Sequence, residues 1–156
     1  MPPVNQRDGM IIASQGLVAV RIGGSPDALL DEVHQEVHDI SLVKDDDGLR
    51  TMAEALVLLT QGRTPVTPLP LDVQGTDFQL RVWGALQQIP AGEVRTYGEV
   101  ADHIGSPKAV RAVGGACGAN PVALVIPCHR VVRADGDLGE YRWGRATKRA
   151  LLDLEA

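Results

Sequence analysis

The stretch Thr96–Gly115, TYGEVADHIGSPKAVRAVGG, carries the clearest fold signal in the chain. Thr96 and Glu99 have the spacing of a capping box, in which each side chain satisfies the other residue's backbone N–H. The pattern predicts a helix over 97–104 that a glycine ends, and a second helix over 108–117 that a Ser-Pro pair opens. Two short helices joined by a Gly-containing turn are typical of a helix-turn-helix, and an ordinary helical hairpin has the same spacing.

The predicted second helix is rich in small residues, including Gly114, Gly115 and Ala116. Each glycine costs about 1 kcal/mol of helix stability relative to alanine, so helix propensity does not explain this composition. Small residues let a helix lie close against another surface, which is either a neighbouring helix or a groove of DNA. Arg111 lies among them and can extend a long cation from a flat face.

The charge is distributed unevenly along the 156 residues, whose formal net charge is −5. Residues 1–75 hold 5 basic and 11 acidic side chains, whereas residues 76–156 hold 10 basic and 9 acidic side chains. Within the second half, Lys108–Arg149 holds 8 basic and 3 acidic side chains. Such a local excess indicates either a phosphate-binding surface or an ordinary solvated basic face.

The composition is that of a globular chain without a disulfide or membrane framework. Hydrophobic residues make up 44% and aromatic residues 3%, so aliphatic side chains must build the core. The longest apolar runs are too short to cross a membrane, and the first residues do not resemble a secretion signal. Two cysteines exclude a disulfide scaffold and a four-cysteine zinc site. We therefore expect a cytoplasmic protein with reduced thiols and no bound metal.

The first half is predicted to be a small α/β unit. Strands are expected over 9–14 and 16–22, helices over 27–38 and 49–61, and a loop over 45–48. Three prolines between Thr64 and Pro70 predict an extended linker. We place a boundary near residue 74, which gives an N-terminal α/β domain with its linker over 1–74 and a C-terminal domain over 75–156. The second domain opens with a helix whose apolar face holds Phe78, Val82, Trp83, Leu86 and Ile89.

The stretch that indicates chemistry is Ile126–Val132, IPCHRVV. Cys128 directly beside His129 is not a protease dyad, because such nucleophiles meet a base from a distant part of the chain. A metal site would need further ligands than this one cysteine and one histidine. From the residues alone, a single cysteine in an apolar stretch is more often an inert core residue than a nucleophile.

Pro127–Arg130, within this stretch, resembles the active-site motif of the O6-alkylguanine-DNA alkyltransferases. The resemblance extends over the segments Gly75–Ala101, Gly105–Gly115, Ala119–Val132 and Gly139–Leu152. It implies an α/β fold with a small, ribonuclease-H-like N-terminal unit and a mainly helical C-terminal domain that carries a helix-turn-helix. It also implies a single-use DNA repair protein that acts as a monomer on double-stranded DNA containing O6-alkylguanine, without a cofactor.

The resemblance assigns the chemistry to five residues. The Cys128 thiolate attacks the alkyl carbon on guanine O6 and keeps the alkyl group. A free cysteine has a pKa of about 8.5, so at neutral pH a base must take its proton. The resemblance gives that step to His129, through a water, and makes Glu155 the group that holds His129. It also implies that Asn120 braces the turn before the active-site segment and that Tyr97 donates a hydrogen bond to guanine N3.

The target atom lies inside the base stack, so the nucleotide must be flipped out of the duplex. The resemblance makes Arg111 the residue that fills the vacated place. The other residues that it implies in DNA contact are Ser106, Lys108, Ala112, Gly115 and Ala116, together with Tyr97. The residues that it implies around the substrate are Ala123, Val131, Tyr141, Arg142 and Trp143. The resemblance implies that the backbone carbonyls of Cys128 and Val131 accept hydrogen bonds from the guanine amino group. It also implies that the backbone N–H of Arg142 faces guanine O6.

Two features depart from the family pattern, and the second cysteine needs an interpretation of its own. Glu155 is the second-last residue of the sequence. Helix ends fray, and a carboxylate at the C-terminal end of a helix opposes the helix dipole. We therefore expect Glu155 to hold His129 less tightly than in family members with a longer tail. The residues before Gly9 are too few for the family's usual first strand. Cys117 is interpreted as a small packing residue.

Two other functions are alternatives. The first is a non-catalytic protein that binds alkylated DNA or regulates transcription, and the presence of Cys128 is the feature that discriminates against it. The second is a cysteine hydrolase, which would need a separate base and an oxyanion site that the sequence does not indicate.

Overall fold

In this computed structural model the described residues are 9–13, 16–22, 25–36, 49–66 and 69–156. The first half contains β1 (Gly9–Ala13), β2 (Leu17–Ile22), α1 (Pro26–Glu36) and α2 (Arg50–Thr60). β1 and β2 pair antiparallel, and the two predicted strands and two predicted helices are confirmed. The predicted strand end at 14, the predicted helix end at 37–38, the loop over 45–48 and the residues before Gly9 lie outside the described residues.

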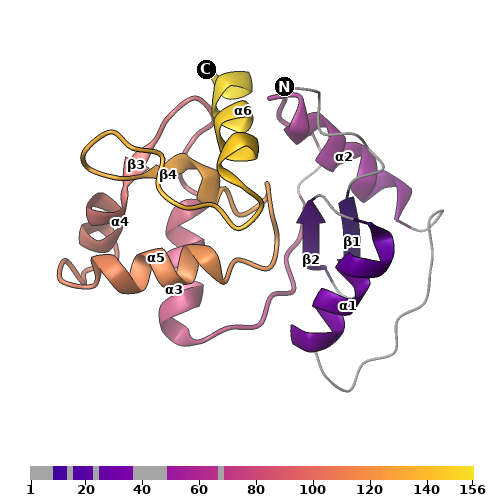
Figure 1. The fold of residues 1–156 in the computed structure, drawn as a ribbon, viewed down its shortest axis with the longest axis horizontal. Helices are drawn as coiled ribbons and strands as arrows, with labels where there is room; N and C mark the ends of the chain where they lie inside the picture. The colour runs from indigo at the N-terminus through magenta and orange to yellow at the C-terminus, as the bar shows by residue number, and fades with distance from the viewer. Residues whose placement is uncertain (1–8, 14–15, 23–24, 37–48, 67–68) are drawn as a thin grey trace.

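The second half is mainly helical. It contains α3 (Asp77–Leu86), β3 (Arg95–Thr96), α4 (Tyr97–His103), α5 (Val110–Gly118), the 3-10 helix η1 (Cys128–Arg130), β4 (Val131–Val132) and α6 (Arg145–Glu155). Figure 1 shows these helices on one side of the molecule, and the β1–β2 pair with α1 and α2 on the other. The chain is thus a mixed α/β protein. None of the helices within the described ranges has the length and apolar character needed to cross a membrane.

The helix-turn-helix begins with the predicted capping box. The backbone N–H of Glu99 donates to Thr96 Oγ1 at 3.1 Å, and the N–H of Thr96 donates to Glu99 Oε2 at 2.7 Å. The second helix starts later than predicted, at Val110. The physical reason is that Ser106–Ala109 form a turn, closed by a backbone hydrogen bond of 2.9 Å between its end residues. Lys108 therefore lies in the turn and not in the helix.

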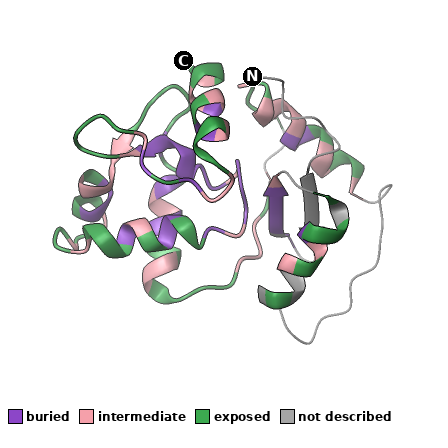
Figure 2. Ribbon diagram, in the orientation of Figure 1, coloured by how far each residue is buried: buried purple, intermediate pink, exposed green. Residues whose placement is uncertain are grey.

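One apolar core joins α3, α5 and the segment that follows α5. Its fully buried members include Val82, Leu86, Val113, Val122 and Ile126. Trp83 of α3 is 2% exposed, and its indole Nε1 donates to Ala116 O at 2.9 Å. Figure 2 shows the buried residues concentrated along β2, η1 and the chain that leads to η1. The segment that carries Cys128 is thus part of the core.

β2 connects the two halves through backbone hydrogen bonds. The N–H of Leu17 donates to Pro70 O at 2.8 Å, and the N–H of Asp72 donates to Leu17 O at 2.8 Å. Further along the strand, the N–H of Val20 donates to Pro121 O at 2.9 Å, and Val20 O accepts from the N–H of Ala123 at 3.3 Å. The end of the predicted linker and the segment leading to Cys128 are therefore both attached to β2. β3 and β4 pair in parallel, which places the start of α4 beside the residues that follow η1.

Candidate active site

Cys128 is the first residue of η1 and is 4% exposed. Asn120 Nδ2 donates to Cys128 Sγ at 3.1 Å and to Ile126 O at 2.8 Å. Asn120 Oδ1 accepts from the N–H of Val122 at 2.9 Å, so this fully buried amide uses both of its ends. The structure therefore brings Asn120 and Cys128 together. Asn120 braces the turn, as the resemblance implies, and it also contacts the sulfur of Cys128 directly.

The surroundings of Cys128 favour the neutral thiol. Burial raises the pKa of Cys128, and the hydrogen bond from Asn120 and the positive charges of Lys148 and Arg142 offset this only in part. The thiol is a much weaker nucleophile than the thiolate. A base close to the sulfur is therefore needed for any reaction at this cysteine.

His129 and Glu155 are in direct contact, with Nε2 and Oε1 2.8 Å apart and side chains that are 1% and 6% exposed. Burial alone would raise the pKa of Glu155, but hydrogen bonds from His129 and Arg130 lower it to about 2. An ionised carboxylate only accepts hydrogen bonds, so we assign the proton to Nε2, and a neutral His129 then has its lone pair on Nδ1. No described residue hydrogen-bonds to Nδ1, which is therefore available to accept a proton.

Arg130 has a role that the sequence reasoning missed. Its Nε donates to Glu155 Oε2 at 2.9 Å, its Nη2 donates to Oε1 at 2.7 Å, and its Nη1 donates to Ile89 O at 2.7 Å. The expectation of a loosely held Glu155 is wrong, because this two-point ion pair fixes the carboxylate. The backbone at Gly62 and Gly92 also lies directly against the end of α6. The one signal in the sequence was the position of Arg130 directly after the histidine.

Lys148 of α6 is a second residue that the sequence reasoning missed, and it is fully buried. Its Nζ donates to three carbonyl oxygens: Val131 at 2.7 Å, Leu138 at 2.5 Å and Glu140 at 3.3 Å. The ammonium lies 5.9 Å from the centre of the Tyr97 ring, and burial lowers its pKa. Lys148, Leu151 and Glu155 recur at helical spacing on one face of α6, which is the signal that could have identified it.

A pocket of about 1070 Å³ has Cys128 in its wall. Further lining residues come from α4, α5 and the loop between β4 and α6, and include Tyr97, Arg111, Cys117, Tyr141 and Arg142. Burial raises the pKa of Tyr97 to about 12, so its hydroxyl is a hydrogen-bond donor at neutral pH. Burial also raises the pKa of Cys117 to about 12, which agrees with the interpretation of Cys117 as a packing residue.

Of the five residues predicted to surround the substrate, Tyr141 and Arg142 are among the described lining residues, and the other three are not. Ala123 and Val131 are fully buried, and the Val131 carbonyl already accepts from the ammonium of α6. Trp143 packs edge-on against Tyr141, with ring centroids 5.3 Å apart and planes at 76°. The structure therefore does not place Ala123, Val131 or Trp143 on the described lining of the pocket, and of these three Trp143 packs against a lining residue, Tyr141.

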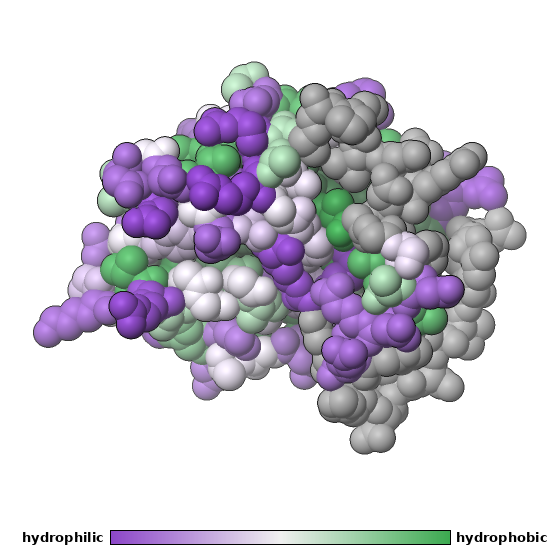
Figure 3. Space-filling model, viewed as in Figure 1, coloured by the Kyte–Doolittle hydropathy of each residue, from purple (hydrophilic) through white to green (hydrophobic). Residues whose placement is uncertain are grey.

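The side of α5 that faces away from the core is built from small residues. A Cβ added at Gly114, Gly115 or Gly118 would meet no atom within 4 Å outside its own helix backbone. Figure 3 shows a pale surface over this helix, with hydrophilic side chains around it. Another macromolecule can therefore approach the helix backbone closely at this surface.

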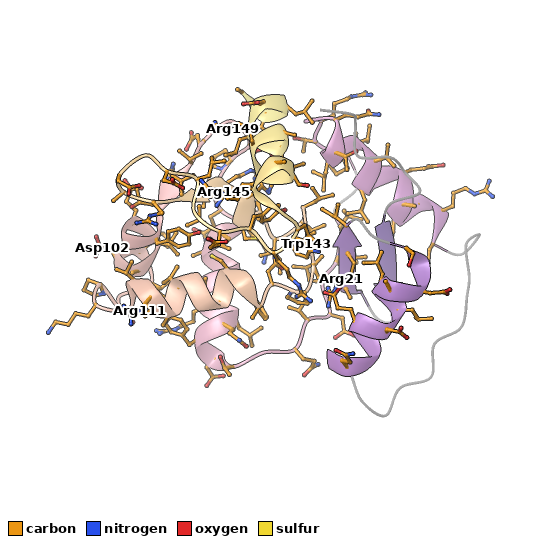
Figure 4. All side chains as sticks on the ribbon, viewed as in Figure 1. Arg21, Asp102, Arg111, Trp143, Arg145 and Arg149 are labelled. Carbon is orange, nitrogen blue, oxygen red and sulfur yellow. The ribbon has the colours of Figure 1, made fainter. Side chains whose placement is uncertain are left out.

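Most of the residues predicted to contact DNA lie at the surface of α5 or in the turn before it, and one of them is buried. Arg111 and Ala112 are exposed in the first turn of α5, and Figure 4 shows Arg111 at the start of this helix. Ser106 is half-buried and Lys108 exposed in the preceding turn. Ala116 is a correction: it is 3% exposed, because the helical period turns it toward α3 and away from the surface.

Comparison with known proteins places this site in a family. A family model described as 6-O-methylguanine DNA methyltransferase, DNA binding domain, matches residues 77–156. The regulatory protein Ada of Salmonella typhimurium is 46% identical over 144 residues, which are 92% of this chain and 41% of that protein. The inducible methylated-DNA–protein-cysteine methyltransferase of Bacillus subtilis is 42% identical over 142 residues, 90% of this chain and 79% of that protein.

A solved structure gives the same result. The Mycobacterium tuberculosis OGT in complex with DNA superimposes with a TM-score of 0.74 and 42% sequence identity, covering 92% of this chain and 83% of that chain. The chain spans 41% of the length of the Ada protein, so the comparison with Ada concerns only part of that protein. The family model, however, matches more than half of the present chain, including η1, the pocket and α6. This chain therefore belongs to the 6-O-methylguanine DNA methyltransferase family.

Proposed function

We propose that this protein repairs DNA by direct reversal, transferring the alkyl group of O6-alkylguanine in duplex DNA to Cys128. The observation that carries the proposal is the sulfur of Cys128, held at 3.1 Å by Asn120 in a pocket wall beside the His129–Glu155 pair. The name of the Bacillus subtilis relative and the DNA complex of the Mycobacterium tuberculosis protein support it.

In the proposed reaction, His129 Nδ1 takes the thiol proton through a water, while Nε2–H stays bonded to Glu155. The sulfur of Cys128 attacks the alkyl carbon, so an S–C bond forms and the C–O6 bond breaks with its electron pair leaving on guanine. Guanine departs with a proton in place of the alkyl group, which balances the proton lost by the thiol. The protonated hydroxyl of Tyr97 donates to guanine N3. Because the thioether is stable, each molecule reacts once.

We place the DNA along the exposed face of α5. The glycines of this face allow the helix to enter a groove closely, and Arg111 is exposed where it can fill the space of a flipped nucleotide. Most contacts then go to the DNA backbone, so we expect weak sequence preference and an affinity that falls with salt. One chain supplies both the pocket and this helix, so the protein acts as a monomer in this proposal.

The division into domains over 1–74 and 75–156 is part of the proposal, as is a ribonuclease-H-like character of the first domain. The antiparallel β1–β2 pair, with α1 packed against β1, supports an α/β unit in the first half. The family model matches from residue 77 onward, which supports a boundary close to residue 74.

The test is to incubate the purified protein with duplex DNA that carries one O6-methylguanine and to measure the intact protein mass. We expect a gain of one methylene unit, saturating at one per protein and mapping to the peptide that contains Cys128. Cys128→Ser should gain no mass under the same conditions.

Two results would contradict the proposal. Methylation of the Cys128→Ser variant at the wild-type rate would show that another group is the acceptor. Stable binding of the modified duplex without any mass change would instead support the alternative of a non-catalytic protein that binds alkylated DNA.

A further inference from the structure

Arg133 directly follows β4 and lines the pocket that has Cys128 in its wall. Its backbone is fixed in the loop: the N–H of Arg133 donates to Asp137 O at 2.9 Å, and Arg133 O accepts from the N–H of Gly136 at 3.1 Å. Its side chain, in contrast, is 60% exposed. A positive charge therefore extends from a fixed point of the backbone at the mouth of the pocket, and the proposed reaction does not use it.

The stem of Arg133 lies beside the hydroxyl group of Tyr97. Gly139 is buried with a φ of +76°, and a Cβ added there would lie 3.0 Å from Tyr97 Oη and 3.3 Å from Arg133 Cγ. Both side chains thus border the same point of the pocket wall. Burial raises the pKa of Tyr97, and the positive charge of Arg133 opposes this effect, which agrees with a short separation.

The position of Tyr97 indicates which part of the nucleotide Arg133 faces. In the proposed reaction the Tyr97 hydroxyl donates to guanine N3. A single ring carbon separates N3 from N9, the atom that carries the deoxyribose. The sugar and its phosphates therefore leave the base at the edge that meets Tyr97. An exposed cation beside this hydroxyl lies on the side of those phosphates.

The ionic partner of Arg133 is held more weakly than that of Arg145, which lines the same pocket and which Figure 4 shows at the start of α6. Arg145 Nη2 donates to Asp137 Oδ1 at 2.8 Å, whereas Arg133 Nη2 lies 3.5 Å from Asp135 Oδ2. An ion pair between two exposed side chains adds little stability, and Asp135 is 58% exposed. A phosphate accepts two charge-assisted hydrogen bonds from one guanidinium and can replace such a partner.

We propose that Arg133 binds a phosphate that flanks the flipped nucleotide, and that the guanidinium exchanges Asp135 for the DNA when the base enters the pocket. The inference rests on the proposed function, because it takes the guanine to lie with N3 on Tyr97. A phosphate contact carries no sequence information, so Arg133 adds affinity for the flipped nucleotide whatever the neighbouring bases are.

The first test measures the Kd of Arg133→Met for a duplex with one O6-methylguanine at several salt concentrations. Parent and variant both carry Cys128→Ser, so that binding is not followed by reaction. Methionine keeps the aliphatic stem beside Gly139 and removes the charge. We expect the Kd to rise roughly 5-fold, and the slope of log Kd against log salt concentration to fall by about 1, as for the loss of one phosphate contact.

The matched control for this test is Arg149→Met in the same Cys128→Ser parent. Arg149 is an exposed arginine of α6 and is not among the described residues that line the pocket. Its loss changes the net charge by the same amount as the loss of Arg133. It should leave both the Kd and the salt slope close to those of the parent.

The second test removes the competing carboxylate. Asp135→Asn keeps the side-chain oxygen Oδ1, which accepts from the N–H of Asp137 at 3.0 Å, and removes the charge that faces Arg133. We expect the Kd to fall roughly 2-fold, because the phosphate no longer competes with a carboxylate. In combination with Arg133→Met this gain should disappear, since the two substitutions act on one contact.

The third test removes the charge from the DNA. An uncharged methylphosphonate replaces the linkage on one side of the O6-methylguanine or on the other, in separate duplexes, and a linkage distant from the lesion is the control. At one of the two flanking linkages the parent should lose affinity roughly 5-fold, whereas Arg133→Met should lose no more, because both changes remove the same contact.

Three results would overturn the inference. The first is an unchanged Kd and salt slope in Arg133→Met. The second is a set of independent, multiplying effects of the substitution and the methylphosphonate at both flanking linkages. The third concerns chains that retain Cys128: if Arg133→Met slows reaction with the free base O6-benzylguanine as much as with the duplex, Arg133 acts on the pocket, because this substrate has no phosphate.

Melting temperatures establish that each variant folds, and Arg133→Gln replaces Arg133→Met in all tests if the methionine variant does not fold. All three contrary results leave the proposed function intact as long as the wild-type protein is methylated on Cys128. If the wild-type protein gains no methyl group from the modified duplex, it is the proposed function that fails.

Discussion

Arg130 and Glu155 form a two-point ion pair that joins η1 to the end of α6, with nitrogen–oxygen distances of 2.9 and 2.7 Å. Because Glu155 Oε1 also contacts His129 Nε2 at 2.8 Å, the guanidinium of Arg130 fixes the group that fixes the histidine. The third nitrogen of Arg130, Nη1, donates to the backbone carbonyl of Ile89, a buried residue three positions after the end of α3. This bond attaches the ion pair to the core. The orientation of the proposed base thus depends on its neighbour in sequence.

The first prediction concerns Arg130→Met. Loss of the guanidinium removes both bonds to Glu155 and leaves a buried carboxylate with His129 as its remaining hydrogen-bond partner among the described residues. We expect the rate of methyl transfer to fall roughly 10- to 100-fold, because the imidazole is no longer held in place. Single-turnover kinetics with an O6-methylguanine duplex measures this effect. Arg81→Met, which removes an exposed arginine from α3, is the control. A wild-type rate in Arg130→Met would refute the orienting role of Arg130.

The second prediction concerns the pH dependence of stability. The pKa of Glu155 is about 2 in the folded protein, against an ordinary value of 4.5. A depressed pKa stabilises the folded state above the unfolded pKa, and this contribution is lost as the pH falls from 4.5 toward 2. Its size is on the order of 2–3 kcal/mol.

Urea unfolding between pH 6 and pH 3 of the wild type and of Glu155→Gln measures this contribution. The difference between their free energies of unfolding should be constant at the upper end of this range and should shrink below about pH 4.5. A difference that does not change with pH would mean that Glu155 titrates normally in the folded protein.

The sequence identified the local features of the site but not the contacts between distant segments. The capping box of Thr96 and Glu99 spans three residues, and the neighbouring Cys128 and His129 stand in one short motif, so both could be recognised from the chain. The roles of Arg130 and Lys148 depend on partners elsewhere in the fold. The helical spacing of Lys148 with Leu151 and Glu155 indicates a shared face of α6, but it does not indicate which atoms Lys148 contacts. For Arg130, the partner carboxylate lies 25 residues away.

The errors in the prediction have the same physical origin. The family resemblance implies that Ala116 contacts DNA, whereas the rotation of α5 about its axis, set by packing on α3, turns Ala116 inward. The sequence predicts too early a start for α5, because Ser-Pro also suits a turn, which Ser106–Ala109 form here. The contact between Glu32 and Arg142 joins residues 110 positions apart and could not be derived from spacing.

The third prediction concerns Gly62, which follows α2 and touches the last turn of α6. Its φ is +71°, a conformation that favours glycine, and a Cβ at this position would overlap the carbonyl of Leu154. Gly62→Ala should therefore lower the melting temperature and displace the helix end that carries Glu155, which slows methyl transfer. The control is Gly84→Ala in α3, where a Cβ meets no atom within 4 Å and alanine should stabilise the helix. Equal melting temperatures for the two variants would argue against this contact.

The fourth prediction concerns Arg111→Ala. If Arg111 fills the place of the flipped nucleotide, its loss should slow repair of O6-methylguanine in duplex DNA by at least roughly 10-fold, since flipping costs a few kcal/mol. The free base O6-benzylguanine needs no flipping, so transfer of its benzyl group to Cys128, with guanine as the leaving group, should keep the wild-type rate. Both rates are measured by the mass of the protein after timed quenching. Equal losses with both substrates would indicate damage to the pocket and not to nucleotide flipping.

The last prediction concerns Lys148→Met. The substitution keeps the length of the side chain but removes the donor for the carbonyls of Val131, Leu138 and Glu140. Buried carbonyls without a donor should lower the free energy of unfolding by at least about 2 kcal/mol, measured in urea. Because the charge of Lys148 lowers the pKa of Cys128, the pH midpoint for iodoacetamide labelling of Cys128 should also move upward. Arg149→Met, the exposed neighbour on α6, should change neither quantity. If stability falls but the labelling midpoint does not change, Lys148 only stabilises the loop that lines the pocket and has no electrostatic effect on the sulfur of Cys128.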